Sequence, residues 1–191
     1  MSMKWLVGVV VLCSTPAFAQ SNGTTFALAR TSFAPAHEYV AADAVPKQLS
    51  LPANLIVSPQ YRPLVEQMLR GSPAFRRQCL RISGESRLIV HLRMGSPQWR
   101  SDFRATTRVT RGGDGRMTAA IEVFPLHDDV ELIAHEIEHV IEQLDEVDLA
   151  SHAANGDTGV RLLSENVFET VRARQTGLKV SGEVRAFTGR R

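Results

Sequence analysis

The chain has 191 residues, with 22 basic and 20 acidic side chains and a formal net charge of +2. A charge so close to zero, 6% aromatic residues and the lack of a binding motif argue against a nucleic-acid partner. The length is sufficient for one domain with a substantial hydrophobic core.

The first 19 residues have the pattern of an export signal. Lys4 supplies the positive charge, Trp5–Cys13 forms the apolar run, and the run 17–19 is a small-x-small cleavage site. The apolar run is too short to span a membrane comfortably. We therefore expect a signal peptide at 1–19, export to the periplasm or secretion, and no stable membrane span.

Cleavage of this segment would leave Cys79 as the single cysteine. Such a chain has no internal disulfide, and we expect Cys79 to be a buried packing residue. The following residues, 20–50, are rich in Ala, Pro, Ser and Thr and show weak periodicity. They predict an extended or partly disordered arm.

The next stretch predicts one helix and several strands. Ser58–Arg70 is expected to be a helix that starts at a serine cap and ends at a Gly and a Pro. Strands are expected at Cys79–Ile82 and Leu88–Met94. A hairpin is expected from Arg104–Thr110 and Met117–Phe124, because the Gly-rich turn 111–115 separates them.

The most informative segment is His135-Glu136-Ile137-Glu138-His139. It lies in a run without Gly or Pro whose apolar residues recur at helical spacing, so a helix is expected over Val130–Leu144. Histidines four apart lie on one helix face and can reach one Zn²⁺, and Glu136 can reach a water on that metal. A surface helix that is merely rich in Glu and His is the less favoured interpretation.

A catalytic zinc site needs a third protein ligand and keeps its fourth position for water. We expect Glu165 to be that ligand, on a helix predicted over Val160–Arg174. Glu169 lies one turn further along the same face, where it could accept the free N–H of a ligating histidine. Other ligand candidates are Asp145, His152 and Asp157.

The HExxH motif with a downstream glutamate resembles the gluzincin branch of the zincin metallopeptidases. The matching residues are His135, Glu136, His139, Glu165 and Glu169. The resemblance implies an α+β fold, in which a small twisted mixed or antiparallel sheet packs on the HExxH helix and a second ligand-bearing helix follows. It also implies that a strand upstream lines the cleft at the sheet edge. Ala119–Phe124 is the candidate for that strand, although an interior position is equally consistent with its sequence.

The function expected from these residues is zinc-dependent hydrolysis, with peptide or protein as substrate. Glu136 would be the general base and His135, His139 and Glu165 the metal ligands. His127, His152 and Arg172 are candidates for stabilising an oxyanion. The alternatives are a small-molecule amidase and a degenerate zincin domain that binds zinc in the envelope without catalysis. We expect a single domain over 51–180 and a C-terminal tail over 181–191.

Overall fold

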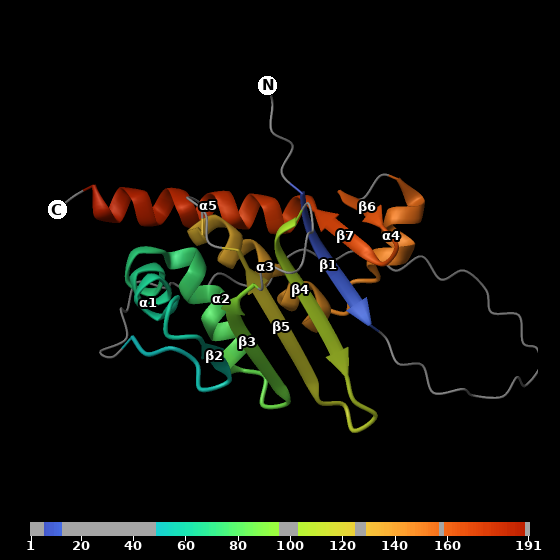
Figure 1. The fold of residues 1–191 in the computed structure, drawn as a ribbon, viewed down its shortest axis with the longest axis horizontal. Coiled ribbons are helices and arrows are strands. Elements are labelled where there is room, and N and C mark those ends of the chain that lie inside the picture. Colours follow the sequence, from blue (N-terminus) through green and yellow to red (C-terminus); the bar gives the residue numbers. More distant parts are fainter. Residues whose placement is uncertain (1–5, 13–48, 96–102, 125–128, 157–158, 190–191) are drawn as a thin grey trace, which may run out of the picture. The chain divides into compact units, whose positions relative to one another are not determined.

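The computed structural model describes residues 6–12, 49–95, 103–124, 129–156 and 159–189, and these residues form a mixed α+β fold (Figure 1). The helices are α1 Arg62–Gly71, α2 Pro73–Ser83, α3 Asp129–Leu144, α4 Leu149–Asn155 and α5 Val171–Thr188. The strands are β1 Leu6–Leu12, β2 Leu55–Val57, β3 Leu88–Met94, β4 Phe103–Arg111, β5 Met117–Val123, β6 Val160–Ser164 and β7 Val167–Thr170.

Within these residues the strands form one sheet of order β2-β3-β5-β4-β1-β7-β6. The β4–β5 and β6–β7 pairs are antiparallel hairpins, whereas β2–β3 and β3–β5 are parallel. β1 lies between the two hairpins, parallel to β4 and antiparallel to β7. The sheet is therefore mixed, as expected from the sequence.

Helix α3 packs against β4 and β5, and α5 packs along α3 and also contacts α1 and α2. In Figure 1 the long α5, in red, runs across these helices. The apolar side of α3 is fully buried at Ile133, Ile137 and Val140. This packing fixes the HExxH helix between the sheet and α5, so its polar side chains are held inside the fold.

Several predicted elements are confirmed. The helix expected over 130–144 is α3, the strand Leu88–Met94 is β3, and the hairpin around 111–115 is β4–β5. The first helix also exists, although it begins at Arg62 instead of Ser58. Cys79 is buried, as expected for a packing residue.

Other predicted elements are wrong. Cys79–Ile82 belongs to α2, which starts because the Ser72 hydroxyl accepts a hydrogen bond from the Phe75 N–H and Pro73 occupies its first turn. The predicted tail from 181 is largely helical, because α5 continues to Thr188. Ala119–Phe124 is a strand as expected, and of the edge and interior positions left open for it the interior one is observed, since β5 pairs with β3 on one side and β4 on the other.

The helix predicted over Val160–Arg174 is replaced by β6, β7 and the first turn of α5. Glu165 and Asn166 form the two-residue turn between β6 and β7, and Asn166 has a positive φ of 57°. A helix cannot pass through such a residue, and the Val, Phe and Thr that follow favour a strand.

The N-terminal predictions are only partly covered by the structure. Residues 20–48 of the predicted arm lie outside the described residues, as do 1–5 and 13–19 of the predicted signal peptide. The apolar run of that signal contributes Leu6–Leu12 to the sheet as β1. None of the described helices is both long and apolar enough to cross a membrane.

Candidate metal centre

Three side chains from two elements converge beside α3. His135 and His139 come from adjacent turns of α3, and Glu169 comes from β7. One potential ligand atom of each residue lies within 4.8 Å of the other two, so the group could hold a metal ion. Both histidines are buried, with exposed fractions of 5% and 0%.

The two imidazoles present their Nε2 atoms to a common point. These atoms are 3.0 Å apart, and His135 Nε2 is 3.5 Å from Glu169 Oε1. Two ligands of a tetrahedral metal at about 2.05 Å are about 3.3 Å from one another. The two measured distances are thus close to that between ligands of one metal ion.

The orientation of His139 is fixed by a chain of hydrogen bonds. Its Nδ1 lies 2.8 Å from Glu142 Oε2, and the Thr170 hydroxyl donates to Glu142 Oε1 at 2.6 Å. A carboxylate accepts from an imidazole N–H, so this pairing favours the tautomer with the proton on Nδ1 and the lone pair on Nε2, the atom that faces His135. Thr170 also caps α5 by accepting the Ala173 N–H, which couples the start of that helix to the site.

Glu136 lies beside the cluster and is fully buried. Its Oε2 accepts a 2.6 Å hydrogen bond from the Thr107 hydroxyl of β4, while its Oε1 has no hydrogen-bond partner among the described residues. Burial raises the pKa of Glu136 well above its ordinary value, the Thr107 hydrogen bond opposes that rise, and the charge of Glu169 adds to it.

Burial also shifts the pKa values of Glu169 and His135. Burial raises the pKa of Glu169 to about 7, opposed by the Thr170 N–H and supported by the charge of Glu142. Burial, and then the neighbouring His139, lowers the pKa of His135 well below its ordinary value. Three carboxyl groups, those of Glu136, Glu142 and Glu169, thus surround the two buried imidazoles, and a cation bound there would favour their ionised forms.

The structure places the predicted ligands differently from the sequence-based expectation. His135 and His139 come together as predicted, and Glu136 is buried on the same helix. Glu165 does not join them, because it lies exposed in the β6–β7 turn, and its expected role as a metal ligand is corrected. Glu169, expected only to orient a histidine, supplies the third potential ligand atom.

The rival ligands are not in the described cluster either. Asp145 is engaged by Arg172 at 2.8 Å and by Arg81 at 3.4 Å. His152 is exposed on α4, and Asp157 lies outside the described residues. Arg172 binds Glu138 at 2.7 Å as well as Asp145, so its guanidinium is committed to this ion-pair network. His127 also lies outside the described residues.

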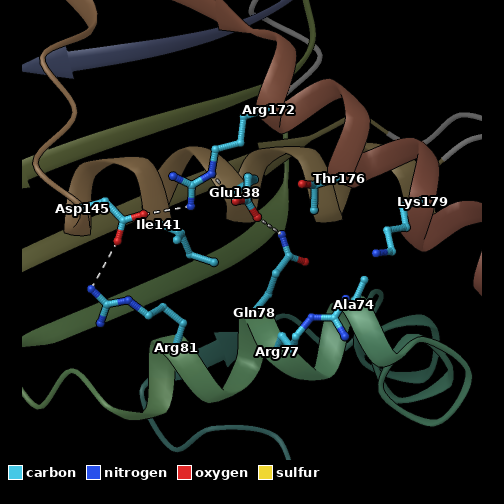
Figure 2. A pocket seen from close by; sticks show the side chains of 10 residues that line it. All are labelled: Ala74, Arg77, Gln78, Arg81, Glu138, Ile141, Asp145, Arg172, Thr176 and Lys179. Carbon is cyan, nitrogen blue, oxygen red and sulfur yellow. Dashed lines mark hydrogen bonds and ion pairs between the residues drawn. The ribbon is translucent and has the colours of Figure 1, made fainter. Parts of the chain in front are cut away.

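Figure 2 shows that these ion pairs belong to a groove between α2, α3 and α5. The groove has a volume of about 380 Å³, and Gln78 joins its two walls by donating to Glu138 Oε2 and to the Ala134 carbonyl. None of the residues that line it belongs to the metal-binding group. The ion pairs in this groove connect α5 to α3, and the groove is separate from the candidate metal centre.

Sequence reasoning missed three residues of the site. Glu142 follows His139 by three positions, so helical spacing alone could have placed it on the same face. Thr107 and Thr170 come from strands far away in the sequence, and no local signal predicts their contacts.

Comparisons with protein-family models, curated proteins and solved structures gave no match for this chain.

Proposed function

We propose that this chain is a zinc-dependent peptidase whose metal ligands are His135, His139 and Glu169. The observation that carries the proposal is the convergence of three ligand atoms within 4.8 Å, beside a buried glutamate with one free carboxylate oxygen. Two imidazole nitrogens and one carboxylate oxygen form the donor set of catalytic zinc sites, which keep a fourth position open.

Two buried oxygens support the fit of a cation and its water. Glu169 Oε1 and Glu136 Oε1 are buried and have no hydrogen-bond partner among the described residues. A buried carboxylate oxygen without a partner is costly, and a metal ion at one and a water at the other would relieve both costs. When bound, zinc would polarise a carbonyl group and lower the pKa of water.

Glu136 supplies the proton transfer in this proposal. The Thr107 hydroxyl occupies Oε2 and fixes the carboxylate, so Oε1 is the atom that accepts a proton from water. A raised pKa suits this task, because a more basic carboxylate takes a proton more readily than an ordinary glutamate and can then pass it to the leaving amine. The products are a carboxylic acid and an amine, which is the stoichiometry of amide hydrolysis.

The test is the substitution Glu136→Gln, which keeps the size of the side chain. Zinc content should be unchanged, because Glu136 is not a ligand, while cleavage of a mixed peptide pool followed by mass spectrometry should fall at least about 10²-fold. Glu165→Gln, at an exposed turn, is the matched control and should keep both zinc and activity.

Two results would count against the proposal. Undiminished cleavage by Glu136→Gln would remove Glu136 from the mechanism. A wild-type protein that holds one zinc but cleaves nothing in the pool would favour the non-catalytic zinc-binding module.

A further inference from the structure

The sheet has a strand position between β4 and β7 that only β1 fills within the described residues. β4 is otherwise paired with β5, and β7 with β6, so each hairpin presents one free edge to this position. Leu6–Leu12 satisfies both edges at once, parallel to β4 and antiparallel to β7. We call this position the β4/β7 slot.

The β4/β7 slot passes between β7, which carries the candidate ligand Glu169, and β4, which carries the threonine that contacts Glu136. Val9 is in register with Thr107 of β4 and with Phe168 of β7. The Thr107 hydroxyl holds Glu136, and Phe168 directly precedes Glu169. An extended backbone in the slot therefore has Thr107, which contacts the proposed base, on one side. On its other side lies Phe168, the residue before the proposed ligand Glu169.

The occupant seen in the full chain indicates the chemistry that the slot accepts. Leu6–Leu12 reads LVGVVVL, which has no charge, no polar side chain and four β-branched residues. Such a sequence favours the extended conformation, and its backbone groups pair with strands on both sides. The flanking side chains of Val109, Val167 and Phe168 are also buried and apolar.

We propose that the β4/β7 slot is a binding site for an extended, apolar peptide segment, and that Leu6–Leu12 is the occupant that closes it in the uncleaved chain. The assignment of such segments as substrates rests on the proposed function, whereas their binding needs no turnover. A chain that has lost the predicted signal would present the slot open beside the metal centre.

The experiment compares two full-length proteins, Glu136→Gln alone and Glu136→Gln with Val9→Pro. The first substitution prevents cleavage, and proline removes a backbone N–H that a central strand needs. The probe is a fluorescein-labelled peptide of the sequence LVGVVVL with two added lysines, followed by anisotropy. The control probe carries N-methyl groups on two adjacent valine amides, so that it cannot form the ladder.

The Val9→Pro protein should bind the probe at least tenfold more tightly than the protein with an intact β1, and it should bind the N-methylated probe weakly. Equal binding by the two proteins would overturn the proposal, as would equal binding of the two probes. Zinc content is measured in the same samples, so a failure of the metal centre is recognised separately from a failure of the slot.

A second variant and a second measurement cover the case in which Val9→Pro does not fold. Gly8→Pro lies where the register with β4 shifts between Leu6 and Gly8, so it is the milder substitution. In the Glu136→Gln protein with its own β1, the amides of β4 and β7 should also exchange slowly with deuterium. Rapid exchange of both edges would show that Leu6–Leu12 does not occupy the slot and would overturn the proposal.

Discussion

His139 depends on two other side chains for its orientation. Glu142 accepts from its Nδ1, and Thr170 holds Glu142 in place. Both partners are buried, at 2% and 3% exposure, so neither bond is exchanged easily for water. Carboxylates that orient a ligating imidazole also raise its basicity, and they contribute to metal affinity although they do not touch the metal.

Glu142→Gln should therefore weaken zinc binding by about 10- to 100-fold while the three ligand residues remain. An amide can still contact Thr170, but it lacks the charge that stabilises the Nδ1–H tautomer. The dissociation constant is measured by competition with a chromogenic chelator. Glu146→Gln, on an exposed neighbour just after α3, is the control and should leave the constant unchanged. An unaltered affinity in Glu142→Gln would show that His139 needs no such partner.

The buried thiol of Cys79 makes the free energy of unfolding depend on pH. Burial raises the pKa of its thiol from 9.0 to about 12, so the folded state holds this proton more tightly than the unfolded state does. The stabilising contribution is complete below pH 9 and is lost as the pH rises toward 12. From the ordinary unfolded pKa, the loss is about 1.4 kcal/mol by pH 10.

We expect the free energy of unfolding, measured with denaturant under chelation, to decrease by about that amount between pH 8 and pH 10. Cys79→Ala should lower the stability at both pH values but flatten the decrease. A thiol reagent at pH 8 should label Cys79 slowly in the folded protein and quickly after unfolding. A steep decrease that persists in Cys79→Ala would assign the pH dependence to other groups.

Among the helices, the geometry of the candidate metal centre depends on how closely α5 crosses α3. A Cβ on Gly177 would lie 2.8 Å from the Glu131 carbonyl oxygen and 3.2 Å from His135 Cβ. The first contact is with backbone, which cannot rotate away. Gly177 thus allows α5 to pack directly against the helix turn that carries His135.

Gly177→Ala should destabilise the protein by about 1–3 kcal/mol, as expected for overpacking in a core, and should weaken zinc binding by displacing α5 from His135. Gly182→Ala is the matched control, because Gly182 lies in the same helix with open space at its Cβ position. That control should be neutral or stabilise by about 0.5–1 kcal/mol, since Ala favours a helix. Thermal unfolding and chelator competition measure both effects, and equal behaviour of the two variants would contradict the packing argument.

Helices and strands could be predicted from the sequence where the apolar residues follow a single helical or strand-like spacing. α3 has apolar residues at helical spacing and no breaker, and β3 and the β4–β5 hairpin have strand patterns around a Gly-rich turn. The secondary structure of residues 160–174 could not be predicted in this way. Its apolar residues have the spacing of one helical face, although they belong to β6, β7 and the start of α5: Val160, Leu163, Val167 and Val171. The decisive feature there is the turn at Glu165-Asn166, and a turn is a weak signal beside four apolar residues.

At the scale of the whole molecule, the site divides into a local and a non-local part. His135, Glu136 and His139 lie within two turns of one helix, so spacing alone places them together. Glu169, Thr170 and Thr107 reach the site through strand pairing and helix packing. The helix predicted over Val160–Arg174 placed Glu165 and Glu169 on one face and favoured Glu165 as the ligand, whereas in the structure Glu165 lies in a turn and Glu169 in a strand.

The candidate metal centre lies where three parts of the chain meet. α3 brings the two histidines, β7 brings Glu169, and β4 brings the threonine that holds Glu136. Arg172 and Gln78 connect α5 and α2 to Glu138 of α3 (Figure 2). Glu169 reaches the histidines of α3 only if the sheet and helices are packed as described. Metal binding that depends on Glu169 therefore tests the packing of the whole fold.

The most direct measurement is the zinc content of three purified proteins by elemental analysis: the wild type, Glu169→Ala and Glu165→Ala. We expect one zinc per chain in the wild type and in Glu165→Ala, and a loss of zinc in Glu169→Ala with an unchanged circular dichroism spectrum. A wild type without zinc, or a Glu169→Ala protein that keeps it while Glu165→Ala loses it, would contradict the proposed centre.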